Sequence, residues 1–242
     1  MTTQSPLKVK RCEFSLGNKK VALLYDKGGD STEILVCGFE KVLGNMLMQN
    51  ALLKFPSITQ MLWGNLNESI YYGTGKGSIR TVLTENGSND LQNRIHKDEI
   101  TSITFSKDRI FLFTASKDET YCMVDPANLD VITQYNFHGN FVRTVAISPL
   151  YVPDAKPARR FHILVGGGQD EKEVTTTGKK GGFEIKLVNY VTSEELAEVK
   201  GHFGPVHSLA FNPDGKSFAS GSEDGYARLH YFQSDYYTPK FE

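Results

Sequence analysis

Two sets of side chains, each with a histidine, a hydroxyl residue and an aspartate, recur along the chain at the same spacing. The sets are His96, Thr114 and Asp118, and His202, Ser220 and Asp224. In both, the histidine precedes the aspartate by 22 residues (118 − 96 and 224 − 202), and the hydroxyl precedes it by four (118 − 114 and 224 − 220). Such groups could form a hydrolase triad, in which histidine takes the serine proton. They could equally satisfy one another as buried hydrogen-bonding partners.

The repetition favours the structural role over catalysis. Threonine replaces serine in the first set, and no G-x-S-x-G segment marks a nucleophile elbow. An enzyme that used a central channel would need converging titratable groups, and the sequence indicates none. We therefore expect a protein that is not an enzyme, with no catalytic, cofactor-binding or metal-binding residues and no cofactor.

The cysteines and the charge balance exclude several other classes. Cys12, Cys37 and Cys122 are odd in number and widely separated, so we expect buried reduced thiols rather than disulfides or a metal site. Lys plus Arg is 27 against 28 Asp plus Glu, so no overall field attracts nucleic acid or a membrane. The basic pairs at 159–160 and 179–180 are interpreted as solvated loop residues rather than RNA contacts. Without an apolar leader or span, we expect a cytoplasmic location.

The elements that must position the repeated side chains are short β-strands. Runs rich in β-branched and aromatic residues occur at 102–105, 110–115, 120–124 and 131–135, separated by turn-forming residues. Four such strands within about 40–45 residues are typical of one β-propeller blade.

The whole chain is predicted to be one all-β propeller domain, residues 1–242. The expected blades lie at approximately 7–49, 59–95, 96–137, 138–200 and 201–242. The fourth blade is the longest because the segments 149–160 and 169–182 interrupt it as surface loops.

A glycine-rich segment, YYGTGKGSI, contains Gly73, Gly75 and Gly77. It resembles a phosphate-cradling loop, but no helical pattern follows, and a helix N-terminus is part of that kind of anion site. Because β-branched residues flank it, a hairpin turn is favoured.

Two further aspartates, Asp108 and Asp125, are candidate partner-binding residues. In a four-stranded meander the first and third turns open on the same side, so these residues of the third blade should share one face. A basic or aromatic-capped helix from a partner could dock there. The alternative is that both aspartates only form their turns.

Longer stretches around the repeated sets are typical of WD repeats. They are HKDEITSITFSKDRIFLFTASKDETYCMVD and GHFGPVHSLAFNPDGKSFASGSEDGYARLHYF. A tryptophan usually completes the motif after the aspartate, but this chain has Val124 and His230 at those places, and its single tryptophan, Trp63, lies elsewhere. We therefore expect a network of the three side chains alone.

From Val9 onwards the chain also resembles subunit i of eukaryotic translation initiation factor 3, a WD-repeat family. The resemblance rests on VKRCEFS, on GGGQDEKEVTTT and on the last WD repeat. It implies a non-catalytic scaffold that supports assembly on the small ribosomal subunit, mRNA recruitment and scanning. The implied partners are subunit b, through its C-terminal helix, and subunit g, with no sequence-specific nucleic-acid binding and no membrane.

The family resemblance also implies a ring of about seven blades, of which we count about five, so a partial or open ring is expected. Another WD-repeat adaptor, such as a kinase receptor-associated scaffold, is the alternative function.

Overall fold

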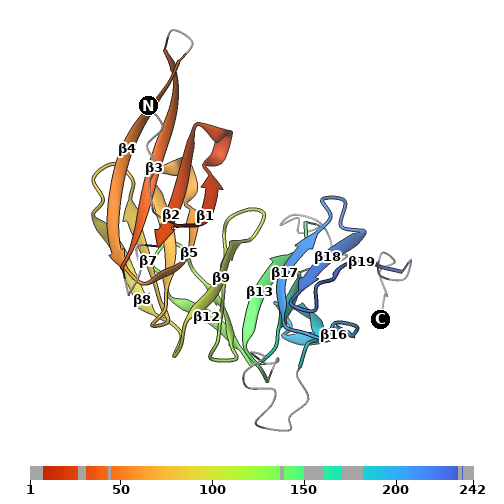
Figure 1. Ribbon diagram of the computed structural model, residues 1–242. Helices are drawn as coiled ribbons and strands as arrows, with labels where there is room; N and C mark the ends of the chain where they lie inside the picture. The colour runs from red at the N-terminus through yellow and green to blue at the C-terminus, as the bar shows by residue number, and fades with distance from the viewer. Residues whose placement is uncertain are drawn as a thin grey trace. The chain divides into compact units, whose positions relative to one another are not determined.

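The computed structural model describes residues 8–26, 31–42, 45–136, 139–149, 161–169, 182–233 and 236, with the backbone alone for 39–42 and 45–56. Within these residues the chain is all-β, with strands β1 to β19 and two short 3-10 turns (Figure 1). The basic pairs at 159–160 and 179–180, and most of both predicted insertions, lie outside the described residues.

Two compact units make up the chain, residues 1–103 and 104–242. The boundary falls within β9 (Ile100–Phe105), so this strand has residues in both units. The single-domain organisation stays a prediction.

The first unit holds two antiparallel sheets with strand order β1-β2-β3-β4 and β5-β6-β7-β8. Their strands are β1 (Lys8–Phe14), β2 (Lys20–Asp26), β3 (Ser31–Val42), β4 (Asn45–Pro56), β5 (Ile58–Trp63), β6 (Ser69–Thr74), β7 (Ser78–Leu83) and β8 (Asn89–Arg94). The 3-10 turns are η1 (Leu16–Asn18) and η2 (Asn65–Asn67). The first sheet continues to Pro56, past the expected end at 49, because β3 and β4 pair along their whole length from Ser31↔Pro56 to Val42↔Asn45.

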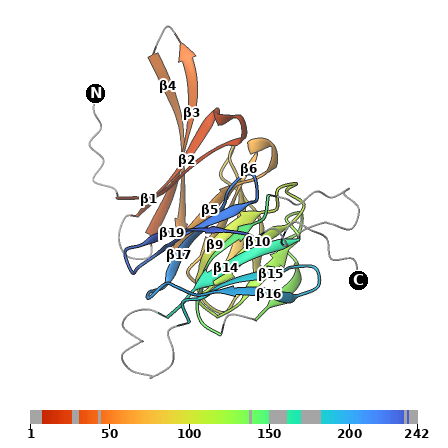
Figure 2. The same ribbon diagram turned by 90° about the vertical axis from the view of Figure 1, so that its right-hand side faces the viewer.

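The remaining sheets have the orders β12-β11-β10-β9, β13-β14-β15-β16 and β17-β18-β19. Their further strands are β10 (Leu112–Ser116), β11 (Tyr121–Val124), β12 (Val131–Tyr135), β13 (Val142–Ile147), β14 (His162–Gly167), β15 (Ile185–Asn189), β16 (Glu194–Val199), β17 (Val206–Phe211), β18 (Ser217–Ser222) and β19 (Ala227–Tyr231). Each sheet is a meander of neighbouring strands, as in a propeller blade. Figure 2 shows the β14–β16 and β17–β19 strands from a second side.

Neighbouring sheets pack face to face through apolar side chains. In the first unit, alternate residues of β2 and β3 point to the sheet β5–β8, because successive side chains of a strand lie on opposite faces. The buried set is Ala22, Leu24, Ile34, Val36, Ile58, Met61, Trp63, Ile70, Tyr72 and Val82. This is the packing expected between propeller blades.

The second unit repeats this arrangement twice. Side chains of β10 to β12 pack against β13, β14 and Tyr190, including a stacked pair of Tyr121 and Tyr135 with ring centroids 4.6 Å apart. Ala146, Leu164, Ile185, Leu187, Val206 and Phe218 form a second cluster, which joins the β13–β16 sheet to the last sheet. The predicted all-β fold with five blades is confirmed.

The cysteines differ in part from expectation. Cys37 and Cys122 are buried, and burial raises the pKa of the Cys122 thiol to about 12. Cys12 is exposed, so the prediction that it is buried is wrong. It lies in β1, whose side chains are nearly all exposed. No helix in the described ranges has the length and apolar character needed to cross a bilayer.

Candidate functional site

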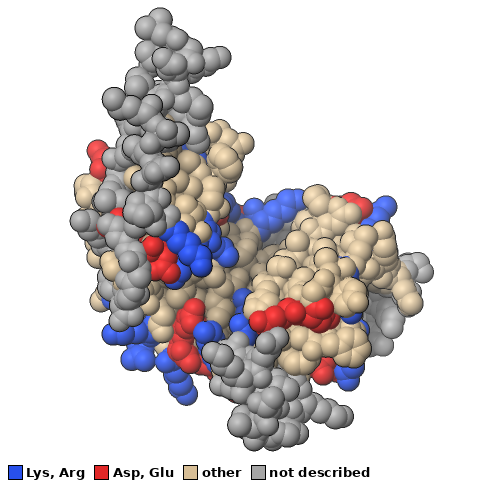
Figure 3. Space-filling view, viewed as in Figure 1, with Lys and Arg blue, Asp and Glu red and all other residues tan. Residues whose placement is uncertain are grey.

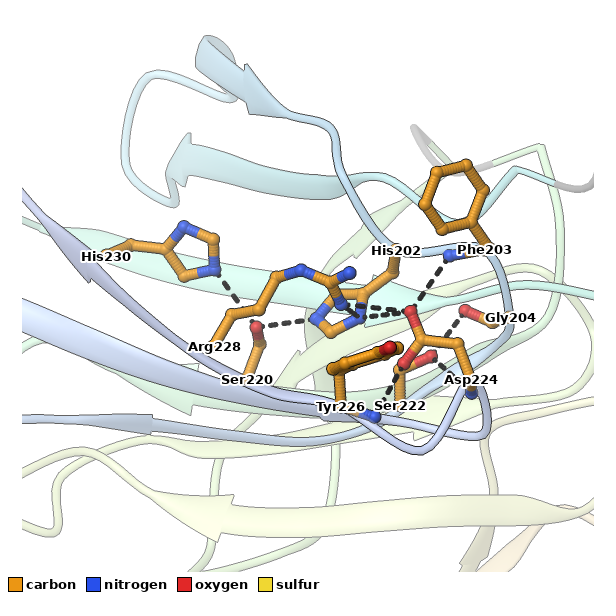
Figure 4. A network of polar contacts seen from close by, with 9 residues as sticks. All are labelled: His202, Phe203, Gly204, Ser220, Ser222, Asp224, Tyr226, Arg228 and His230. Carbon is orange, nitrogen blue, oxygen red and sulfur yellow. Dashed lines mark hydrogen bonds and ion pairs between the residues drawn. The ribbon is translucent and has the colours of Figure 1, made fainter.

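The structure brings His202, Ser220 and Asp224 together in the last sheet (Figure 4). His202 precedes β17, Ser220 lies in β18, and Asp224 lies in the turn between β18 and β19. The imidazole Nδ1 is 3.0 Å from Asp224 Oδ2, and Nε2 is 2.7 Å from Ser220 Oγ. The His202 side chain is only 2 % exposed. The contacts therefore tie the loop before the sheet to a strand and a turn within it.

The Asp224 carboxylate is the centre of this network. It accepts hydrogen bonds from the backbone amides of Phe203 and Tyr226, each at 3.0 Å, and from Arg228 Nη1 at 2.9 Å. Burial by itself raises the pKa of Asp224, but the donated hydrogen bonds outweigh burial and hold that pKa well below its ordinary value. Asp224 is therefore ionised at neutral pH and fixes both the loop and the turn.

Two members of the network were not assigned from the sequence. Arg228 contacts both His202 Nδ1 and Asp224, and His230 Nε2 lies 3.0 Å from Ser220 Oγ. His230 occupies the place where a WD repeat usually has tryptophan, so the expected network of three side chains is extended by an imidazole. The signal available in the sequence was a polar histidine at position 230, where a WD repeat usually has tryptophan.

One protonation pattern satisfies the three central groups, and we assign it from the hydrogen-bond network. His202 donates from Nδ1 to Asp224 and accepts at Nε2 from the Ser220 hydroxyl, so the Arg228 guanidinium, which can only donate, bonds to Asp224 rather than to the ring. Ser220 Oγ then accepts from His230 Nε2. Burial, followed by the nearby His202 and Arg228, lowers the His230 pKa and favours the neutral ring, which can donate to Ser220 when its proton is on Nε2.

The arrangement resembles a hydrolase triad in its distances but not in its access. Ser220 is 2 % exposed, and its hydroxyl lies between two imidazoles within a sheet. A nucleophile must be reachable by the carbon that it attacks. The geometry therefore suits a structural link. Among the residues with described positions, no group of three or more His, Cys, Asp or Glu could hold a metal ion.

The first repeated set is divided between the two units. His96 belongs to the first unit and is 3 % exposed, with its backbone amide donating to Gly77 O at 3.0 Å. Thr114 is fully buried in β10, and Asp118 accepts from the Thr120 amide at 3.0 Å in the second unit. A network joining His96, Thr114 and Asp118 stays a prediction.

Asp108 and Asp125 lie in the turns between β9 and β10 and between β11 and β12. Asp108 Oδ1 accepts from Ser106 Oγ at 2.5 Å and from the Ile110 amide at 3.1 Å. Asp125 Oδ1 accepts from the Ala127 amide at 2.8 Å. Both carboxylates thus form their own turns, as the alternative interpretation required. Asp108 Oδ2 is buried and has no hydrogen-bond partner within the described residues.

Comparison with known proteins gives a consistent result. Residues 91–125 and 193–230 match the WD40 family, described as "WD domain, G-beta repeat". "Eukaryotic translation initiation factor 3 subunit I" of Bombyx mori is 35 % identical, covering 100 % of this chain and 72 % of its own length. The proteins of the same name from Drosophila willistoni and Culex quinquefasciatus are 37 % and 36 % identical, covering 97 % and 96 % of this chain and 72 % and 71 % of their own lengths.

Proposed function

The chain belongs to the family of eukaryotic translation initiation factor 3 subunit I, and we propose that it is a non-catalytic scaffold subunit of that factor. The observation that carries the proposal is the sequence relationship over nearly the whole chain. The alternative, another WD-repeat adaptor such as a kinase receptor-associated scaffold, receives no support from these relatives.

The structure of the last sheet supports binding rather than turnover. The His202 network buries its polar groups, yet its backbone bonds fix Phe203 and Tyr226, whose side chains are 83 % and 63 % exposed. Exposed aromatic side chains on a backbone fixed by hydrogen bonds are favourable contacts for a protein partner. We propose that the network is an internal strut that keeps this edge of the blade in a fixed shape.

The proposed partners are subunits b and g of the factor, with subunit b contributing a C-terminal helix. Through the complex the chain would assist assembly on the small ribosomal subunit, mRNA recruitment and scanning in the cytoplasm. The face shown in Figure 3 carries both basic and acidic side chains, in keeping with the net charge of −1. A field of that kind supplies no general attraction for nucleic acid.

Asp108 and Asp125 are proposed to contribute to partner binding. One aspartate lies in the turn between β9 and β10, and the other lies in the turn between β11 and β12. In a meander these two turns lie at the same end of the strands. Both aspartates are partly exposed, so a basic group of a partner could reach their side chains.

Affinity purification from cells expressing a tagged chain tests the function. We expect subunits b and g to be recovered with the parent chain. Charge reversal at both aspartates, Asp108→Lys with Asp125→Lys, should reduce that recovery, whereas Glu198→Lys on the outer strand β16 should not. Unchanged recovery with the double variant would refute the role of the two aspartates alone. Failure of the parent chain to recover either subunit would refute the scaffold proposal.

A further inference from the structure

A small cavity lies at the turn between β6 and β7, in the glycine-rich segment. Ser57, Thr74, Lys76, Ser78 and Arg80 line it, and its volume is about 160 Å³. Pockets for drug-sized ligands are about 300–1,000 Å³, whereas a single water needs about 10–15 Å³ on a comparable measure. The cavity therefore suits a small ion or one functional group rather than a nucleotide.

The hairpin brings these side chains to one side of the sheet. Thr74 pairs with Ile58, and Tyr72 pairs with Arg80, in the antiparallel register of β5, β6 and β7. Because side chains alternate along a strand, Thr74, Ser78 and Arg80 share one face. Ser57 joins them from the link before β5, where its φ of 51° is in the left-handed region that serine rarely adopts.

The lining is cationic. Lys76 and Arg80 contribute two positive charges, and the lining residues include no Asp or Glu. Arg80 Nε is buried and has no hydrogen-bond partner among the described residues. Because guanidinium remains charged at all ordinary pH values, a buried donor without an acceptor is unfavourable. An anion in the cavity would relieve this cost.

The donors available to such an anion come from side chains. The Gly75 and Gly77 amides donate to Ser57 O at 3.0 Å and Thr74 O at 3.2 Å, so they already have acceptors. Thr74 Oγ1 accepts from the Ser78 amide at 3.1 Å. The hydroxyls of Ser57 and Ser78, in contrast, make no hydrogen bond within the part of the chain that the structure describes. The donors left for an anion are thus the Ser57 and Ser78 hydroxyls, the Lys76 ammonium and Arg80 Nε, while another part of the Arg80 guanidinium bonds to Tyr72.

We propose that this cavity binds one phosphoryl oxyanion, held by Lys76 and Arg80 and by the hydroxyls of Ser57 and Ser78. The planar guanidinium offers directional donors that match phosphate oxygens, and Lys76 adds a mobile charge at the rim. The site uses a turn rather than a helix N-terminus, so it differs from the phosphate loop that the glycine spacing resembles. It is independent of the scaffold function.

Nuclear magnetic resonance of the full chain tests the site directly. Inorganic phosphate is titrated at pH 7 and constant ionic strength, with sodium chloride as the reference salt. We expect saturable shifts of the Arg80 Nε–H signal and of the Gly75 and Gly77 amides. Absence of a saturable shift at these positions would overturn the proposal. Titration with ethyl phosphate distinguishes the two sources of the phosphoryl group. If ethyl phosphate binds as tightly as inorganic phosphate, the ligand is a phosphate monoester. If only inorganic phosphate binds, the ligand is the free ion.

Variants separate the site from general charge effects. Lys76→Gln changes an exposed turn residue, so it should leave the fold intact and weaken phosphate binding about tenfold, as for loss of a charge-assisted hydrogen bond. Arg11→Gln removes the same charge from the exposed strand β1 and should leave binding unchanged. Equal affinity in Lys76→Gln and the parent, or an equal loss in Arg11→Gln, would refute the assignment.

Discussion

Replacing Ser220 by alanine is the sharpest perturbation of the last blade. The change removes one oxygen atom and leaves no large cavity. Two imidazole nitrogens lose their partner, His202 Nε2 at 2.7 Å and His230 Nε2 at 3.0 Å. His202 is the more costly loss, because its side chain is 2 % exposed and water has little access to the freed nitrogen.

The size of the effect follows from that burial. A buried polar group that loses its partner costs about 1–3 kcal/mol, and the partly exposed His230 can turn to water at lower cost. We therefore expect Ser220→Ala to lower the free energy of unfolding by about 2 kcal/mol. For a chain of this size that corresponds to a decrease in Tm of about 4–8 °C.

Thermal and urea unfolding, followed by circular dichroism, measure this loss. Hydrogen exchange should place the loss of protection in β17 to β19. The matched control is Ser208→Ala in β17, since Ser208 is exposed and its substitution should leave stability within about 0.5 kcal/mol of the parent. Equal stability of Ser220→Ala and Ser208→Ala would show that the network does not act as a strut.

Three further results are expected. The His230 pKa is lowered in the folded chain from 6.5, so the unfolded chain binds more protons and stability falls as pH drops below about 6.5. His230→Gln should reduce the loss of stability that urea titrations measure between about pH 7 and pH 5.5. An unchanged loss of stability would contradict this expectation. Gly77→Ala should lower the free energy of unfolding by at least about 2 kcal/mol in the same titrations, because φ is 77° and a Cβ would lie 2.2 Å from His96 O. A loss below about 0.5 kcal/mol, the size typical of surface substitutions, would argue against the turn geometry. Exposed Cys12 should react with a thiol reagent in the folded chain and buried Cys122 only after unfolding, as mass spectrometry would show; early labelling of Cys122 would contradict its burial.

Spacing alone predicted much of the fold and part of the site. The interval from His202 to Asp224 is fixed by the length of one loop, two strands and a turn, so a repeated interval indicates a repeated sheet. The same interval could not reveal Arg228, whose contact with Asp224 depends on side-chain direction in β19. It also could not show that His230 would replace the usual tryptophan by bonding to Ser220.

Burial was harder to infer than strand position. Cys12 lies in a strand with valine and phenylalanine nearby, a pattern that predicts a buried thiol, yet β1 exposes nearly all of its side chains. Which face of a strand is covered depends on neighbouring sheets rather than on local sequence. The cavity beside Arg80 was missed for a similar reason, because its lining combines a hairpin with Ser57 from a separate link.

The most direct test of the scaffold assignment is an electron cryo-microscopy map of a native initiation complex that contains the tagged chain. We expect density for its five blades within translation initiation factor 3, in contact with subunits b and g. We also expect His202 and Asp224 inside the last blade, away from any bound substrate. A factor that assembles fully without the chain, or a substrate seated against Ser220, would contradict a scaffold role.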